Sequence, residues 1–440
     1  MTLSMLGLML GLILLIILTL KGMNILIAAP LCALILAVTS HIPIIPPLAD
    51  NNTSLTVSYM TGFASFLQNW FIVFLLGSMF GKVMEISGAA DSLAHWIMHT
   101  FGSKHAPFAI VLTCAMLTYG GVSVFVVAFS VFPMALSLFK DANLPRRFIP
   151  AALAFGSITF TMTSAGSVEI QNFQPMQYLG TNQFAGWPVS LVVALFMAST
   201  GMWLFHVMIK RAVAKGEHFD DRENDPTPKT SNMLPHPFLC FIPLILVLGS
   251  SFYCSVILHF GRSSLIIALL TGLISAVILY WKRFVQLGSA LSVATYSALI
   301  AIANTCAVVG FGSVAKLTPA FNDTLIYMTA LPGNGLISAA IAISVIVALT
   351  GSASGGQAIA LPLIAPHYLD AGVDPNALHR VIAITSGGLD SLPHNGYVIT
   401  TIRVICGETH KTAYLPLGAL TVLIPFIGAI LAIFLFILGM

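Results

Sequence analysis

The stretch S-G-G-L-D-S-L-P-H-N-G, residues 386–396, lies near the end of a chain that is apolar on both sides of it. Its eleven residues include an Asp, a His, an Asn, a Pro and three Gly. In hydrocarbon every backbone N–H and C=O needs a partner, so irregular backbone survives there only against protein or a water-filled cavity. The stretch therefore predicts a membrane span that is broken at a polar site.

The composition sets the class of protein around this break. Of 440 residues, 58% are hydrophobic and 8% are charged, whereas a soluble domain carries about 25% charged residues. A span needs roughly 20 apolar residues, and this length predicts ordinary spans at about 3–20, 23–39, 64–86, 186–208, 237–258, 262–281, 289–314 and 413–439. The chain is therefore expected to be an all-α polytopic membrane protein.

Several function classes are disfavoured by what the sequence lacks. The six Cys stand singly and form no C-x-x-C pair, which argues against a disulfide framework or a thiolate metal site. No G-x-x-x-x-G-K-[ST], H-E-x-x-H or G-x-S-x-G motif occurs, and Asp390 has no second mid-span Asp to complete a protease dyad. The first residues lack a basic n-region, so a retained span is expected there and not a signal peptide. We expect the protein to bind no cofactor, no metal and no nucleic acid, and we do not expect it to be an enzyme.

The two halves of the chain share a pattern of punctuation residues. A shift of 231 residues aligns Phe80-Gly81 with Phe311-Gly312, Gly120 with Gly351 and Ser123 with Ser354 without a gap. Chance is the alternative for any one match, but the order of the matches favours a duplication. The expected units are a first repeat at 1–209, a linker at 210–236 and a second repeat at 237–440.

Each repeat is expected to hold five spans and a re-entrant hairpin. The hairpins are predicted at about 104–140 and 335–370, with arms of about 15 residues that are too short to cross comfortably. The broken spans are predicted at about 146–180 and 375–406. Because five crossings are an odd number, the second repeat is inverted relative to the first. The fold expected is thus ten spans and two hairpins in two inverted repeats.

The distribution of Lys and Arg indicates the orientation. With the N-terminus outside, fifteen fall in cytoplasmic segments, and only Arg262, Lys316 and Arg380 fall outside. No Lys or Arg is expected in the membrane interior, and both termini are expected outside a bacterial cytoplasmic membrane. The charge and Pro content of the linker predicts a solvated connector, with a regulatory role as the alternative.

Four polar breaks supply the candidate binding site: the hairpin turns at 119–123 and 350–356, the segment 161–167 and the opening stretch. Broken helices expose N-termini that favour anions, and neutral donors lie close by. The candidate substrate contacts are Ser123, Thr163, Ser164, Ser167, Ser352, Ser354, Gln357, Ser391, His394 and Asn395. A site without fixed cations suits one carboxylate with hydroxyls and suits citrate poorly.

Two carboxyl groups are candidates for carrying a proton. A charged Asp390 at membrane depth would cost roughly 2.5–3.5 kcal/mol, which makes it a functional candidate. The alternative is that Asp390 caps the second half-helix through backbone N–H groups. Glu169 is the second candidate, and its position past the first break places it nearer the outer surface.

Four motifs resemble the gluconate permease family of the ion transporter superfamily. They are F-L-L-G-S-M-F-G-K-V-M-E-I-S-G-A-A (74–90), D-A-N-L-P (141–145), L-T-G-S-A-S-G-G (349–356) and S-G-G-L-D-S-L-P-H-N-G-Y-V-I-T (386–400). The resemblance covers nearly the whole chain. It implies proton-coupled uptake of small hydroxy acids, with scaffold and transport domains, an elevator motion and a homodimer.

The chain departs from the gluconate carriers in two places. Their break P-P-H-P-G-P corresponds to T-M-T-S-A-G-S here, and the acidic residue of their first hairpin, near Val122, is missing. The opening stretch is similar instead to the 3-hydroxybutyrate permease-like branch, so a proton symporter of 3-hydroxybutyrate or a similar monocarboxylate is expected. A gluconate or sugar-acid permease, a cation/proton antiporter and a membrane enzyme or sensor are the alternatives, and coupling to Na⁺ stays open.

Overall fold

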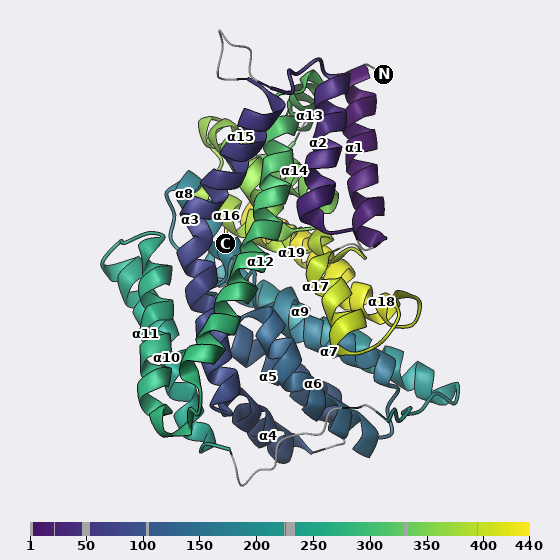
Figure 1. The fold of residues 1–440 in the computed structure, drawn as a ribbon, viewed down its shortest axis with the longest axis vertical. Helices are drawn as coiled ribbons and strands as arrows, with labels where there is room; N and C mark the ends of the chain where they lie inside the picture. Colours follow the sequence, from purple (N-terminus) through teal and green to yellow (C-terminus); the bar gives the residue numbers. More distant parts are fainter. Residues whose placement is uncertain are drawn as a thin grey trace.

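The computed structural model describes residues 3–21, 23–45, 53–102, 105–223, 225, 234–329, 333–393 and 395–440. Every regular element within these ranges is helical, which confirms the all-α class (Figure 1). His394, a candidate substrate contact, lies outside the described residues.

The helices of the first half differ widely in length. They are α1 (Leu3–Leu20), α2 (Ile25–Thr39), α3 (Leu55–Ile86), α4 (Ala89–Phe101), α5 (Ala106–Tyr119), α6 (Val124–Asp141), α7 (Ile149–Ala154), α8 (Ile170–Leu179) and α9 (Trp187–Ala214). A π-helical segment, Phe155–Thr159, continues α7 up to an irregular stretch that ends where α8 begins.

The second half runs through its elements in a similar order. Its helices are α10 (Pro237–Phe252), α11 (Ser263–Leu279), α12 (Leu287–Ala315), α13 (Pro319–Thr329), α14 (Gly335–Thr350), α15 (Ala353–Asp370), α16 (Pro375–Ser386), α17 (Gly396–Ile399), α18 (His410–Gly418) and α19 (Ile424–Ile437). Between α16 and α17 lies the opening stretch, with one short 3₁₀ turn at Leu389–Ser391.

Six helical stretches of the described chain are long and apolar enough to cross a membrane. They are Leu55–Ile86, Val124–Asp141, Trp187–Ala214, Pro237–Ile257, Leu287–Ala315 and His410–Ile437. Large apolar side chains such as Trp203 and Ile278 are about two-thirds exposed on their outer faces, as expected where lipid is the solvent. The chain is a multi-pass membrane protein. One expectation is wrong in detail: α6 and α15 are each 18 residues long, longer than the predicted hairpin arms.

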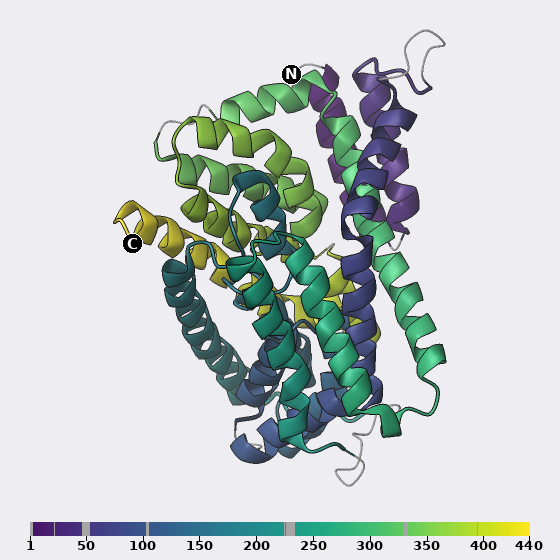
Figure 2. The same ribbon diagram turned by 90° about the vertical axis from the view of Figure 1, so that its left-hand side faces the viewer.

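The helices pack in two groups. In the first, α3 packs along α12, α2 packs on α12, α11 packs on α3, and α1 and α10 cover α2 and α11 (Figures 1 and 2). Small residues let α3 and α12 approach, since a Cβ on Gly62 would lie 2.0 Å from the Ser313 Oγ. In the second group, α5 and α6 pack on α7, α8 packs on α15 and α16, and α9 packs on α19.

The two helical hairpins lie toward opposite ends of the molecule. The pair α5 and α6 lies with α4 at the lower end in Figure 1, whereas α14 and α15 lie with α13 toward the upper end. Both hairpins contact the broken segments of the second group, α5 at Phe155–Thr159 and α15 at α8 and α16. The turns of both hairpins therefore reach the middle of the fold.

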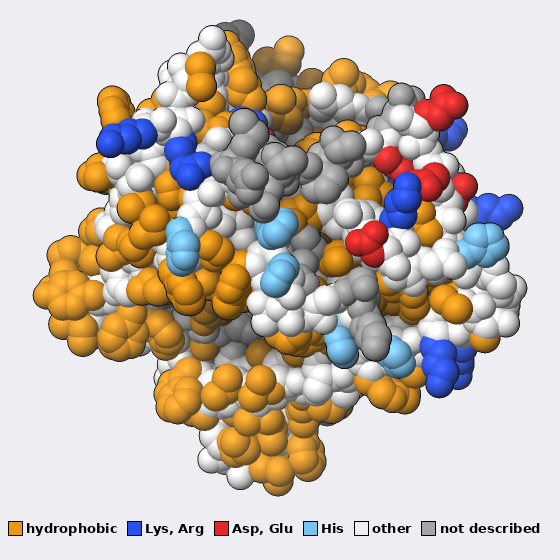
Figure 3. Space-filling model, turned by 90° about the horizontal axis from the view of Figure 1, so that it is seen from below, with side chains coloured by type: hydrophobic (Ala, Val, Ile, Leu, Met, Phe, Trp, Pro, Cys, Tyr) orange, Lys and Arg blue, Asp and Glu red, His pale blue; other side chains and the backbone are white. Residues whose placement is uncertain are grey.

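The described part of the linker is docked against the lower end, where charged side chains gather (Figure 3). Arg146 pairs with Asp225 at 2.9 Å and with Glu408 at 3.4 Å, and Glu408 also pairs with Arg222 at 2.7 Å. Arg146 and Glu408 are both buried. Most described linker residues are exposed, and the linker also completes a partly buried ion-pair network.

Candidate functional site

A cavity of about 600 Å³ lies between the two helical groups. One wall comes from the turn between α1 and α2 and from α3 and α12. The other wall comes from both hairpin turns and both broken helices. Segments from both halves of the chain, far apart in sequence, thus converge on one space.

The first hairpin turn reaches the cavity through a pair of glycines. Gly121 has a φ of +91°, a conformation that residues with a side chain rarely adopt, and a Cβ there would meet Val168 at 3.0 Å. Ser123 precedes α6 without a capping hydrogen bond from its side chain and lines the cavity. Ser123 therefore lies on the cavity wall, where a contact with substrate was predicted for it.

The second hairpin turn carries two cavity-lining serines. Gly351 ends α14 in the left-handed conformation, with a φ of +62°. Ser352 then caps α15, because its Oγ accepts a hydrogen bond from the Gly355 N–H at 3.1 Å. Ser352 and Ser354 both line the cavity, and their hydroxyls lie 3.4 Å apart. The N-terminal turn of α15, beside two hydroxyls, suits an anionic group.

The first broken helix behaves differently from its prediction. Thr163 donates to the Thr159 carbonyl at 3.4 Å, Ser164 donates to the Phe160 carbonyl, and Ser167 accepts from the Glu169 N–H at 3.3 Å. All three are buried, and none lines the cavity. Their hydroxyls satisfy the backbone that the break leaves open. The structure therefore does not bring these predicted substrate contacts to the site.

The second broken helix places Asp390 on the cavity wall. The carboxylate is 6% exposed, accepts from the Ser391 hydroxyl at 2.8 Å, and also accepts from the Ala353 backbone N–H at the start of α15. Capping of the second half-helix falls to Asn395, which accepts from the Val398 N–H at 3.0 Å. The alternative role of Asp390 as that cap is therefore wrong. Ser391 is buried behind Asp390 and does not line the cavity.

Two amide side chains join the second hairpin to the breaks. Asn395 lines the cavity and donates to the Gly351 carbonyl at 2.9 Å. Gln357 donates to Ser386 at 2.7 Å and to the Gln171 carbonyl at 3.1 Å, and it lies outside the cavity lining. Gln357 thus fastens α15 to α16 and α8, and its predicted contact with substrate is not supported.

The cavity also gathers polar groups that the sequence reasoning placed elsewhere or missed. Glu169 lines the cavity together with Asp390, although it was expected nearer the outer surface. Asn304 and Thr305 of α12 line it as well, and so does Ser78 of α3. The sequence signal for Asn304 and Thr305 was a polar pair in an otherwise apolar span that contains no helix break.

Arg380 lies in the protein interior. It is fully buried, and its Nη1 donates to the Thr163 carbonyl at 2.6 Å, inside the first break. Arg380 was expected in an outer segment, with no Lys or Arg in the membrane interior; the structure shows that its side chain is buried against other helices and not exposed in a loop. Arg380 lies in the second turn of α16, close to the loop that precedes this helix.

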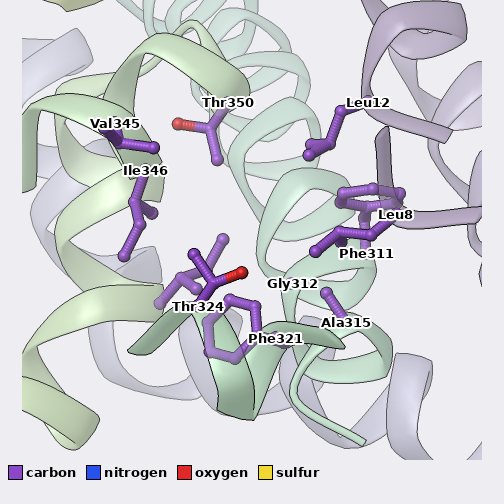
Figure 4. Close-up of a pocket in the computed structure, with 11 residues that line it drawn as sticks. Leu8, Leu12, Phe311, Gly312, Ala315, Phe321, Thr324, Val345, Ile346 and Thr350 are labelled. Carbon is purple, nitrogen blue, oxygen red and sulfur yellow. The ribbon is translucent and has the colours of Figure 1, made fainter. Parts of the chain in front are cut away.

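A second, smaller cavity adjoins the upper hairpin. It holds about 60 Å³ between α1, α12, α13 and α14, and Figure 4 shows its mainly apolar walls, including Leu8, Leu12 and Phe311. Apolar voids of this kind stay dry. Thr350 borders both cavities. The smaller space is almost entirely apolar, with two threonines among its lining residues, so the larger cavity is the candidate site. Among the described residues, no three His, Cys, Asp or Glu gather as a metal site.

Comparisons with known proteins place the chain in a transporter family. The sequence model of the GntP family of permeases matches residues 1–438. An uncharacterized transporter of Bacillus subtilis, YxjC, is 35% identical over 92% of both chains. An uncharacterized transporter of Haemophilus influenzae is 29% identical over 39% of both chains.

A solved structure has a similar fold. The YdaH transporter of Alcanivorax borkumensis, whose crystal structure is described as having an unusual topology, superposes with a TM-score of 0.58 at 16% identity, over 97% of this chain and 99% of that chain. At that identity the likeness concerns the fold alone. The match over the whole length, and the relative at 35% identity, show that this chain belongs to the GntP family of permeases.

Proposed function

We propose that the protein is a proton-coupled secondary transporter that imports a small hydroxycarboxylate, with 3-hydroxybutyrate or a similar monocarboxylate as substrate. The observation that carries this proposal is the cavity of about 600 Å³ between the two helical groups. It joins two hairpin turns, two broken helices and two carboxyl groups in one space. Polar sites of this kind, at the meeting of discontinuous helices, are typical of secondary transporters.

The lining of the cavity supports a small substrate with one carboxylate. The described lining residues include no Lys or Arg, and the donors are neutral: Ser123, Ser352, Ser354, Asn304, Thr305 and Asn395. The N-terminal turns of α6 and α15 add backbone N–H groups and the positive end of a helix dipole. One carboxylate and one hydroxyl match this set, whereas three carboxylates would lack counter-charges.

Coupling is assigned to the carboxyl groups of the cavity wall. Asp390 is buried against Ser391 and the start of α15, so its protonation state is sensed by the second hairpin. Protonation would let the hairpin turn hold an anionic substrate without a second negative charge beside it. Glu169, at the entry to α8, is the second proton site in this proposal.

The proposed architecture is two inverted repeats of five spans and one hairpin each. The similar order of elements in both halves and the hairpins at opposite ends of the molecule support it (Figure 1). The first helical group would be the scaffold, and the second would move as the transport domain in an elevator motion. The proposed assembly is a homodimer in a bacterial cytoplasmic membrane, with both termini outside. The excess of Lys and Arg on one side supports this orientation.

A cation/proton antiporter is the second candidate. Such a transporter needs more than one buried carboxylate, and the presence of Glu169 and Asp390 in one cavity is the observation that favours it. The two candidates differ in their substrates: the antiporter would change internal pH when Na⁺ is added, with no organic acid present.

Purified protein in liposomes tests both candidates. Uptake of 3-hydroxybutyrate, gluconate, lactate and citrate is compared with and without an inward proton gradient. The proposal expects gradient-driven accumulation of 3-hydroxybutyrate above the other acids. Accumulation of gluconate alone would favour the sugar-acid alternative, and Na⁺-dependent pH changes without any acid would replace the symporter by the antiporter. Counterflow of no acid would contradict the transporter proposal for this substrate class.

A further inference from the structure

Arg380 is a buried cation without a carboxylate partner among the described residues. Its side chain is fully buried, and its guanidinium donates to three backbone carbonyls. The bonds are Nη1 to Thr163 at 2.6 Å, Nε to Ala185 at 3.0 Å, and Nη2 to Ala185 at 2.9 Å and to Gln183 at 3.3 Å. Carbonyl dipoles solvate the guanidinium, but they leave its full positive charge in place.

The residue before it strengthens the same connection. His379 is also fully buried, with its Nδ1 2.7 Å from the Thr181 hydroxyl and its Nε2 3.3 Å from the Asn172 amide oxygen. Two consecutive polar side chains of α16 therefore hold the irregular backbone on both sides of α8. Asn172 in turn donates to the carbonyls of Ser167 and Gln183. This network fixes the first break in position.

The charge is joined by a hydrogen bond to the residue that follows a cavity-lining residue. Thr163, which receives the shortest bond from Arg380, follows Met162, and Met162 lines the cavity. The methyl group of Thr163 also approaches Gly387, at the beginning of the opening stretch, so closely that a Cβ there would lie 2.7 Å from it. Arg380 thus stands where the two broken helices meet. In a low-dielectric interior the field of such a charge is weakly screened.

A positive charge near the cavity would add to the neutral donors that its lining supplies. Its described lining holds the carboxyl groups of Asp390 and Glu169 and no cationic side chain. An anionic substrate would meet like charges there unless a positive charge stands nearby. We propose that Arg380 is the fixed cation of the transport site: without touching the substrate, it sets the preference of the cavity for anions through its field. The inference rests on the proposed function, and Arg380 acts in it as a positioning and charge-balancing residue.

The electrical potential of the cavity can be measured without any substrate. A cysteine is introduced by Ser354→Cys, and its rates of reaction with a sulfonate-bearing and a trimethylammonium-bearing methanethiosulfonate are compared. The six native cysteines are buried, so the protein without the introduced cysteine serves as the blank. In the Arg380→Gln background the ratio of anionic to cationic rates is expected to fall by about tenfold or more, since one unit charge is lost from the interior. Arg380→Lys is expected to leave the ratio nearly unchanged.

A second variant removes the net charge but keeps the arginine. Thr163→Asp introduces a carboxylate on the residue whose backbone carbonyl accepts from the guanidinium, and it is expected to lower the rate ratio as Arg380→Gln does, even if the glutamine variant fails to fold. A merely structural role would change both reagent rates by the same factor and leave their ratio intact. That result in either folded variant would overturn the inference.

Transport assays separate this inference from the proposed function. Arg380→Gln is expected to weaken competition by 3-hydroxybutyrate by about tenfold and to leave competition by its neutral amide nearly unchanged. If wild-type protein moves no hydroxy acid while the rate ratio still falls in Arg380→Gln, the proposed function fails and the charge assignment stands. If the acid is transported and the ratio does not fall, the charge assignment fails alone.

Discussion

At the scale of single residues, Asp390 is the group whose chemistry the proposed coupling needs. Asp390→Asn keeps the size of the side chain and its acceptor for the Ser391 hydroxyl, 2.8 Å away, but an amide cannot take up and release a proton. We expect proton-driven accumulation to be abolished and some substrate exchange to remain. Uptake and counterflow in the same liposomes measure the two activities separately.

The matched control for this substitution is Asp374→Asn. Asp374 is exposed and caps α16 by accepting from the Ala377 N–H at 2.7 Å, and Asn is an equally good cap. This variant is expected to accumulate substrate as the wild type does. Normal accumulation by Asp390→Asn across an imposed pH gradient would remove Asp390 from the coupling mechanism.

The sequence predicted some of the cavity-lining residues and missed others for physical reasons. Ser123, Ser352, Ser354 and Asp390 were found because each interrupts an apolar run, and such an interruption demands a polar surrounding. Thr163, chosen by the same rule, instead satisfies the carbonyl of Thr159. Sequence cannot separate a hydroxyl that serves substrate from one that serves its own backbone, because both arise at the same break.

At the scale of elements, the broken helices were easier to predict from the sequence than the contacts that other elements make with them. Gly351 and the residues after it indicate the second hairpin turn from the sequence alone. No local sequence pattern indicates that Asn395, from another element, donates to the Gly351 carbonyl at 2.9 Å. The docked linker is a similar case. The charges of the linker predict a solvated segment, and only the fold brings Arg146 between Asp225 and Glu408.

The linker network gives a prediction about stability. Arg146→Met removes a buried cation and leaves Glu408, itself buried, with Arg222 as its remaining ion-pair partner in the described chain. Removing one member of a buried ion pair is strongly destabilising, so we expect a loss of about 3 kcal/mol in the free energy of unfolding. Reversible unfolding in mixed detergent micelles measures it. Trypsin is also expected to cut sooner after Arg222 in this variant.

The exposed ion pair beside this network is the control. Lys140 pairs with Asp221 at 2.8 Å, but both side chains are more than half exposed. Exposed pairs contribute little, so Lys140→Met is expected to leave unfolding and the rate of cleavage unchanged. Equal losses in the two variants would mean that burial of Arg146 does not decide its contribution.

At the scale of the whole molecule, the elevator proposal requires the second helical group to slide along the first. The boundary between the groups is closely packed where α12 meets α15. A Cβ on Gly312 would lie 2.4 Å from the Cγ1 atom of Ile359 and 3.3 Å from its Cγ2 atom. Cysteines at these two positions are therefore within reach of the Cβ separation of a disulfide, about 3.5–4.5 Å.

The pair Gly312→Cys and Ile359→Cys thus tests the motion. Because α12 would stay still while α15 moves, oxidation of this pair is expected to stop transport, and reduction is expected to restore it. The matched pair is Gly62→Cys and Ser313→Cys, which joins α3 to α12 inside the first group. A Cβ on Gly62 would lie 2.7 Å from the Cβ atom of Ser313, so the two helices must part by about 1 Å to form the bond. Oxidation of this pair is expected to leave transport intact, since no motion separates the two helices. Transport that continues with the α12–α15 bond formed would show that substrate crosses without a sliding of one group along the other.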